Sequence, residues 1–126
     1  MLPMSKSKRA ETEILRDVRE AIARVKTYAA GIEYAEFLED IKTQDAVVRN
    51  LEIIGEAVKN ISTDFRKKHK GVEWKNIAGF RDRMIHHYFG INWEIVWDVI
   101  KNKLPELDDQ VEKILKTFDT KKKHKN

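Results

Sequence analysis

The 126-residue sequence contains no cysteine, only 5 glycines and only 2 prolines. The lack of cysteine excludes disulfide bonds, thiolate nucleophiles and cysteine-ligated metal ions. The scarcity of glycine and proline argues against an all-β domain, which needs these residues in its many short turns. No apolar run approaches the length of a membrane span, and residues 1–10 lack the apolar segment of a signal peptide. A cytoplasmic location is therefore the default expectation.

Helix-forming residues are abundant instead, and 41% apolar residues are enough for one core. Apolar side chains recur at three- and four-residue spacing in two long stretches, 12–30 and 44–61, with Thr12 and Thr43 as the expected N-caps. Shorter helices are expected over 64–69, 80–89, 93–102 and 105–118, with a helical link near 34–41 and a tight turn over 72–77. The predicted fold class is all-α: a compact antiparallel helical bundle with two long N-terminal helices and shorter C-terminal helices.

Positive charge is concentrated at both ends and in the middle of the chain. Residues 1–10 carry three basic side chains, and the last six residues carry four lysines. Residues 44–90 hold nine basic and six acidic groups, whereas the stretches on either side are acidic. We expect a flexible tail over 1–11, one helical domain over 12–118 and a flexible basic tail over 119–126. The central segment offers a modest local field for an anion.

One segment within that basic region combines an arginine, two histidines and a tyrosine: Arg81-Asp82-Arg83-Met84-Ile85-His86-His87-Tyr88. An arginine can clamp a phosphate, and a histidine can move a proton near neutral pH. A tyrosine hydroxyl can donate a hydrogen bond to the reacting group. These are the side chains that metal-free phosphodiester chemistry requires.

On a single ideal helix, however, this segment is a poor site. A separation of five residues rotates the helix by about 140°, so Arg81 and His86 do not share a face, whereas Arg81 and Tyr88 lie within about 20°. Either the helix begins irregularly after Gly79, or a second copy of the chain completes the site. Simpler structural explanations stay open: pairing of the arginines with acids such as Glu52, Glu56 or Glu73, histidines on the surface, and a tyrosine in the core.

The remaining polar and aromatic groups favour ordinary structural roles. We expect Trp74, Trp93 and Trp97 to anchor the core or an interface rather than to stack on bases. The basic run 66–70 is expected to be a solvated surface, with contact to RNA phosphates as the second interpretation. Adjacent histidines point apart on a helix, so we expect no metal site, and the absence of a glycine-rich phosphate loop gives no reason to expect a cofactor.

The sequence resembles the HepT-like ribonucleases of the HEPN superfamily, which are the toxin half of two-gene toxin–antitoxin systems. The resemblance extends over about residues 12–116 and is carried by segments 37–40, 43–57, 74–82, 85–90 and 103–107, with Trp97 and Asp98. The family signature is Arg, four residues, His, one residue, Tyr, and Arg81, His86 and Tyr88 satisfy it. Asp82 fits the polar residue that commonly follows the arginine. His87 replaces an acidic residue that is frequent in relatives.

This resemblance implies a homodimer that brings two motifs together and cleaves RNA without metal. Arg81 and His86 would be catalytic, with Asp82 and Tyr88 supporting them. Candidate RNA contacts are Arg49, Arg83 and His87. The ribose 2′-OH would attack the phosphate, so DNA would resist cleavage.

The resemblance also implies a partner. A minimal nucleotidyltransferase antitoxin would attach AMP to Tyr88 and block the phosphate site by charge and volume, with or without a larger toxin–antitoxin assembly. Two other functions stay open at this point. One is a nucleotide- or RNA-binding module that does not cleave, and the other is a structural dimer that sequesters its partner.

Overall fold

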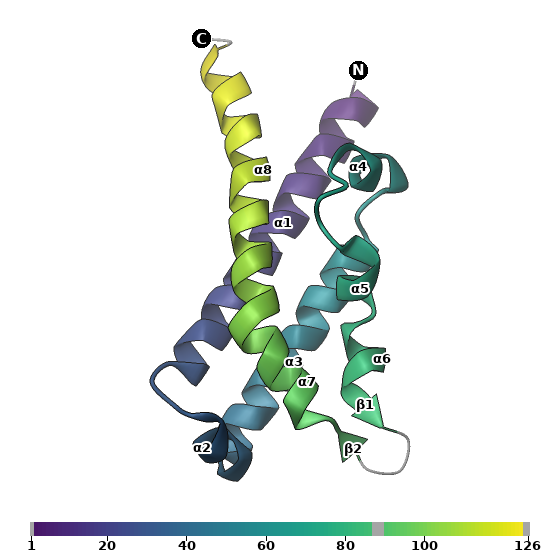
Figure 1. Ribbon diagram of the computed structural model, residues 1–126. Helices are drawn as coiled ribbons and strands as arrows, with labels where there is room; N and C mark the ends of the chain where they lie inside the picture. The colour runs from purple at the N-terminus through teal and green to yellow at the C-terminus, as the bar shows by residue number, and fades with distance from the viewer. Residues whose placement is uncertain (1, 87–89, 125–126) are drawn as a thin grey trace.

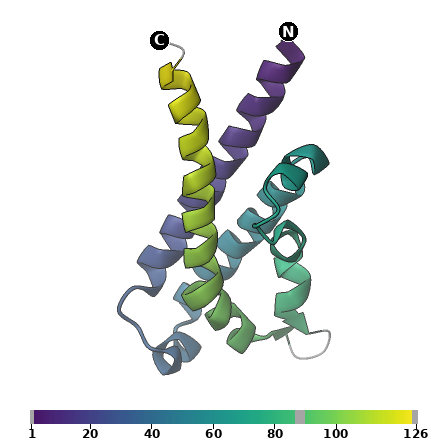
Figure 2. The same ribbon diagram turned by 45° about the horizontal axis from the view of Figure 1, so that its top comes forward.

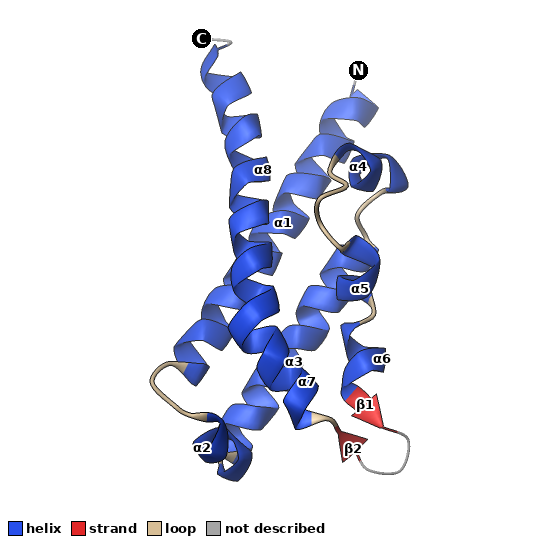
Figure 3. Cartoon of the chain, in the orientation of Figure 1, coloured by secondary structure: helices blue, strands red, loops and turns tan. Residues whose placement is uncertain are grey.

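The computed structural model describes residues 2–86 and 90–124 of the chain (Figure 1). The elements in chain order are α1 (Leu2–Ala29), α2 (Tyr34–Glu39), α3 (Ile41–Lys59), α4 (Thr63–Lys68), α5 (Trp74–Ala78), α6 (Phe80–Met84), β1 (Ile85–His86), β2 (Gly90–Ile91), α7 (Trp93–Asp98), the π-helical segment η1 (Val99–Lys103) and α8 (Leu104–His124). Figure 3 shows that helices dominate these residues and that the two strands are short. The expected all-α class is confirmed. None of the described helices is both long and apolar enough to cross a membrane.

Three long helices form the body of the bundle, one more than the sequence analysis expected. Helix α1 packs against α3 and also against α8, and the two neighbours run in the opposite direction to α1 (Figure 1). The core between them contains side chains that the helical periodicity predicted to face inward, among them Val18, Val25, Val47, Leu51, Ile54 and Val58. Leu15, Val111 and Ile114, for which no inward position was predicted, are buried there as well. Burial of these faces is what holds short and long helices together in water.

Helix α1 begins at Leu2 and α8 continues to His124, so both helices extend into the segments expected to be tails. The physical reason is that residues 2–11 contain no glycine and a single proline, Pro3, which lies in the first turn where a missing N–H is tolerated. Residues 119–124 contain no helix breaker at all. The flexibility of the two tails stays a prediction.

The N-cap of α3 is Asp40, not Thr43 as predicted. The Asp40 carboxylate accepts hydrogen bonds from the Thr43 backbone N (3.0 Å) and from Thr43 Oγ1 (2.6 Å), and these bonds lower the pKa of Asp40. Gln44, one residue further, is buried and donates from Nε2 to the carbonyl oxygens of Phe37 (2.9 Å) and Leu38 (3.0 Å). These contacts fix α2 against the start of α3.

The tryptophans pack as the sequence analysis expected. Trp74 is buried and donates from Nε1 to the carbonyl oxygen of His69 (2.9 Å). Trp93 and Trp97 lie against Phe37, with ring centroids 5.6 Å and 5.1 Å from its own. Trp74 is thus part of the core, and Trp93 and Trp97 are half-buried against it, within the core or interface role predicted for the three.

The helix predicted over 80–89 is wrong at Ile85 and His86, and residues 87–89 lie outside the described residues. Helix α6 ends at Met84, and Ile85 has extended backbone angles (φ −99°, ψ 126°). Strand β1 then pairs antiparallel with β2, in the register Ile85 with Ile91 and His86 with Gly90. The Asn92 backbone N donates to the Met84 carbonyl oxygen (2.7 Å), which closes the base of this hairpin. Two β-branched residues therefore form a short pair at the point where a helix was expected to continue.

The expected break between the last two helices is also wrong. Asn92 caps α7 as predicted, because its side chain accepts from the Ile95 backbone N (3.2 Å). Helical backbone then continues from α7 through η1 into α8. The Leu104 backbone N bonds to the Val99 carbonyl oxygen five residues earlier. This wider turn precedes Pro105, whose ring would clash with an ordinary α-helical turn.

Candidate active site

Helix α6 is held in place by close backbone packing of its neighbour α5 on α3. A Cβ atom added at Gly55 of α3 would lie 3.3 Å from the Ile77 carbonyl oxygen and 3.5 Å from the Ala78 carbonyl oxygen of α5. Only glycine allows this approach without displacement. The sequence analysis gave Gly55 no role, although a glycine within a helical pattern is a signal of close backbone packing.

The buried ends of α6 determine which of its side chains face solvent. Phe80 and Met84 are almost fully buried, at 2% and 1% exposure. The three residues between them, Arg81, Asp82 and Arg83, are exposed. The arginine of the motif therefore lies on a short helix that is fixed at both ends by the core.

Arg81 projects from this helix with a largely free guanidinium group. Its side chain is 67% exposed, and its Nε lies 3.5 Å from Oε2 of Glu52 on α3. Among the described residues, this ion pair is its only hydrogen-bonding or ionic contact. The terminal amino groups of Arg81 are thus available for a phosphate, in the two-pronged geometry that guanidinium groups use. Of the acids considered as partners, Glu56 contacts Lys59 instead, and Glu73 accepts from Asn76.

His86 belongs to a different element from Arg81. Its backbone lies in β1, opposite Gly90, so the five-residue spacing crosses the end of α6 rather than following one helix. The rotation of about 140° calculated for a continuous helix therefore does not apply to this pair. The side chain of His86, and the whole of His87 and Tyr88, lie outside the described residues. The roles assigned to these three residues stay predictions.

Arg49 and Arg83, the other candidate RNA contacts that the structure describes, are both exposed. Arg49 precedes Glu52 by three residues on α3, which places the two on neighbouring positions of the helix surface. Arg83 lines a small cleft between α5, α6 and the start of α8. The described residues contain no group of three or more His, Asp or Glu that could hold a metal ion.

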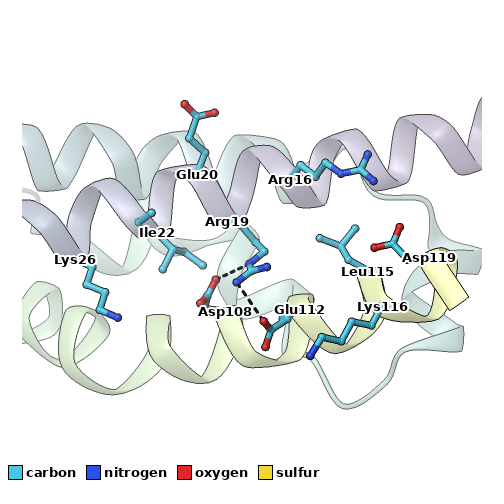
Figure 4. A pocket seen from close by; sticks show the side chains of 11 residues that line it. Arg16, Arg19, Glu20, Ile22, Lys26, Asp108, Glu112, Leu115, Lys116 and Asp119 are labelled. Atoms are coloured by element: carbon cyan, nitrogen blue, oxygen red, sulfur yellow. Dashed lines mark hydrogen bonds and ion pairs between the residues drawn. The ribbon is translucent and has the colours of Figure 1, made fainter.

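A larger groove, of about 590 Å³, lies on another side of the molecule between α1 and α8 (Figure 4). Arg19 crosses it, with Nε 3.0 Å from Asp108 Oδ1 and a terminal amino group 3.8 Å from Glu112 Oε2. The hydrogen bond from Arg19 to Asp108 raises the pKa of Arg19. Acidic and basic groups neutralise each other here, so the groove offers an anion less than the exposed Arg81 does.

The helical bundle agrees with a domain of the HEPN class. The family model described as "Ribonuclease HepT-like" matches residues 18–114, and the chain belongs to this family of ribonucleases. The resemblance stated from the sequence is thus confirmed.

Curated relatives agree with this assignment over most of the chain. "Putative RNase MJ0127" of Methanocaldococcus jannaschii is 47% identical over 83% of this chain and 87% of its own length. "Putative RNase TTE0752" of Caldanaerobacter subterraneus is 50% identical over 81% of this chain and 88% of its own length. "Probable ribonuclease HepT" of Thermococcus cleftensis is 42% identical over 86% of this chain and 99% of its own length. No solved structure matches the chain significantly.

Proposed function

We propose that this protein is a metal-independent endoribonuclease that acts as a homodimer and as the toxin of a toxin–antitoxin system. The observation that carries the proposal is the exposed Arg81, held by a rigid helix with its terminal amino groups free among the described residues. In the proposed reaction, Arg81 binds the scissile phosphate and stabilises the negative charge that develops on its oxygens.

His86 supplies the proton transfer in this mechanism. It removes the proton from the ribose 2′-OH, or donates one to the departing 5′-oxygen, as a histidine can do near neutral pH. The 2′-oxygen bonds to phosphorus as the bond to the 5′-oxygen breaks. The products are a 2′,3′-cyclic phosphate and a 5′-OH end. Asp82 and Tyr88 orient the phosphate, the histidine or a water molecule.

A dimer places two copies of the motif beside each other. Ile85, which follows α6 directly, is 44% exposed, so a dimer contact at this end of α6 would remove apolar surface from water. Arg49, Arg83 and His87 are proposed to contact the RNA on either side of the cleaved bond.

The decisive experiment is cleavage of a defined RNA in the presence of a chelator. Wild-type protein should cut the RNA but not the same strand with a single 2′-deoxy substitution at the cut site. Arg81→Ala and His86→Ala should each reduce cleavage at least about a hundredfold. Arg24→Ala is the matched control, because Arg24 is an exposed arginine paired with Glu20 on α1. RNA that survives the wild-type protein would contradict the mechanism and favour a binding module without cleavage. RNA that His86→Ala cuts as fast as wild type would contradict the role given to His86.

Regulation is proposed to act on the same motif. A cognate minimal nucleotidyltransferase attaches AMP to the Tyr88 hydroxyl, and the added phosphodiester occupies the place of the substrate phosphate beside Arg81. Incubation with that enzyme and ATP should raise the intact mass of the wild-type protein in steps of about 329 Da. The same incubation should not raise the mass of the Tyr88→Phe variant. Modified protein that still cleaves RNA at the unmodified rate would exclude this form of control.

A further inference from the structure

Five exposed basic side chains follow one another on the short helices that lead to the motif: Lys67 and Lys68 on α4, Lys70 in the turn after it, Lys75 on α5 and Arg83 on α6. We call them the basic ridge. None of the five has an ion pair or hydrogen bond with another described side chain. On α1 and α8, Arg19, Arg24 and Lys113 are paired with nearby acids, whereas Lys26 and Lys116 make no such contact with a described side chain.

The elements that carry the basic ridge lie in succession along one side of the bundle. In Figure 1 they descend the right-hand side from α4 through α5 and α6 to β1, and the tilted view in Figure 2 keeps them on that side. Helices α5 and α6 both pack on α3. From Glu52, the partner of Arg81, to Lys59 at the end of α3 is roughly 10 Å along the helix axis, and α4 extends the path further. The ridge therefore spans several nucleotides of an extended strand.

At the end of the ridge that is farthest from Arg81, contacts within the protein hold α4 and the turn after it in place. Ser62 caps α4 by accepting from the Phe65 backbone N (3.2 Å), and the Phe65 ring is buried. Arg66 points inward and donates from Nη2 to the Val58 carbonyl oxygen (2.9 Å). Trp74 bonds to the His69 carbonyl oxygen on the other side of the turn. These contacts orient the lysines of α4 outward before any ligand arrives, which reduces the entropy lost on binding.

The burial of the aromatic rings near the ridge determines whether the ridge can bind bases or only phosphates. Its Phe and Trp side chains, Phe65, Trp74 and Phe80, are all buried, and the half-buried His69 ring lies against Phe65, with the ring centroids 4.6 Å apart. They offer no face on which a base could stack. Lysine side chains bind phosphates as point charges and carry no information on base sequence. The ridge is therefore suited to the backbone of a nucleic-acid strand and not to its bases.

We propose that the basic ridge binds the phosphate backbone of the RNA strand beside the cleaved bond and guides this flank from Arg81 toward α4. The proposal rests on the proposed ribonuclease function. Because the ridge contacts phosphates outside the reacting bond, it sets the affinity for long RNA and leaves the chemical step unchanged. Binding should be independent of sequence and strongly dependent on salt.

The test compares two triple variants of equal charge. Lys67→Gln/Lys68→Gln/Lys70→Gln removes three charges from the ridge. The control, Lys26→Gln/Lys42→Gln/Lys116→Gln, removes three exposed charges elsewhere. Both are made in the Arg81→Ala background, and binding of fluorescein-labelled RNAs of about 6 and about 20 nucleotides is measured by anisotropy over a range of salt.

The ridge variant should bind the longer RNA at least about tenfold more weakly at low salt. The slope of its plot of log affinity against log salt should be smaller in magnitude by about 2, because each of the three lost phosphate contacts contributes about 0.7. The control variant should lose less than about twofold. Single-stranded DNA should behave as RNA does, because only phosphates are read. Equal losses of RNA affinity in the two variants would overturn the proposal. A ridge variant that binds RNA as before but no longer binds the nucleotidyltransferase would also overturn it.

This binding assay does not depend on cleavage. Failure of the proposed ribonuclease function would appear as intact RNA in the chelator experiment, whereas failure of the ridge would appear here. In an active background, the ridge variant should raise KM for the longer RNA by the same factor and leave kcat unchanged. A fall in kcat with unchanged KM would also contradict the proposal.

Discussion

Glu52→Gln tests what the acidic neighbour of Arg81 does, because it removes the charge and keeps the shape. At 3.5 Å in water, opposite unit charges attract by about 1 kcal/mol, and measured exposed ion pairs contribute about 0.2–1 kcal/mol. The Arg81 and Glu52 side chains are 67% and 43% exposed, so the low values apply. We expect the free energy of unfolding of Glu52→Gln to differ from wild type by less than about 1 kcal/mol.

The effect on RNA binding should be larger than the effect on stability and of opposite sign. The Glu52 carboxylate lies beside the guanidinium group proposed to bind a phosphate, so it repels the incoming phosphate and competes with it for Arg81. Relief of about 1 kcal/mol corresponds to about a fivefold fall in KM. This gain should vanish toward about 1 M salt, where the Debye length is about 3 Å. The rate constant kcat should not change, because Glu52 engages Nε and leaves the terminal amino groups of Arg81 free.

The assay is steady-state cleavage of RNA at several salt concentrations, with thermal unfolding measured on the same samples. Glu56→Gln is the matched control: Glu56 lies one turn further along α3, where its carboxylate contacts Lys59 at 3.1 Å. The control should change KM by less than about twofold. A tenfold loss of kcat in Glu52→Gln with KM unchanged would refute the competition between Glu52 and phosphate. Glu52 would then be a positioning residue that holds Arg81 in its productive orientation.

Four further substitutions test the scaffold around the site. Gln44→Leu removes both bonds to the α2 carbonyls but keeps the volume, so the free energy of unfolding should fall by about 1–3 kcal/mol in urea denaturation; an unchanged midpoint would exclude this role. Gly90→Ala and Gly31→Ala both impose a side chain at positive φ (77° and 74°) without a clash against the described residues, so each should cost about 1–2 kcal/mol. Only Gly90→Ala should also impair cleavage, and equal losses of activity would indicate general destabilisation. Burial and the nearby Lys68 lower the pKa of His69 below 6.5, so stability should decrease as pH falls from about 7 through that lowered pKa. His69→Gln should flatten this dependence, and identical urea profiles of the two proteins from about pH 7 to about pH 5 would contradict it.

The long helices were predictable because their signal is redundant. Inward positions such as Val18, Leu51 and Ile54 repeat over several turns, so no single residue decides the outcome. The prediction of where a helix starts depends on one or two residues, so a single wrong choice moves the predicted start, as happened at α3. Thr43 is a good N-cap by type, but Asp40 precedes it by three residues and accepts its backbone N–H. Two capping residues at this spacing compete, and only the folded chain shows which one begins the helix.

The end of α6 was not predictable from local pattern. Residues 84–89 contain neither glycine nor proline, so nothing nearby argues against a helix that continues to Gly90. What ends the helix is pairing across the hairpin, Ile85 with Ile91 and the Met84 carbonyl oxygen with the Asn92 backbone N. Such contacts depend on where β2 lies after folding, and helix propensity is a weak prior against them. The motif could thus be found from the sequence, but its division between two elements could not.

That division has a functional consequence. The position of Arg81 depends on the core, through the buried Phe80 and Met84 at either end of α6. The position of the His86 backbone depends instead on its pairing with Gly90 in the hairpin of β1 and β2. In the proposed mechanism the arginine binds the phosphate and the histidine transfers the proton. A change confined to the hairpin should therefore lower kcat and leave RNA affinity nearly intact. Gly90→Ala should lower kcat without changing affinity for RNA. The helices that carry Arg81 and the basic ridge precede the hairpin in the chain, and α5 and α6 are held by their packing on α3.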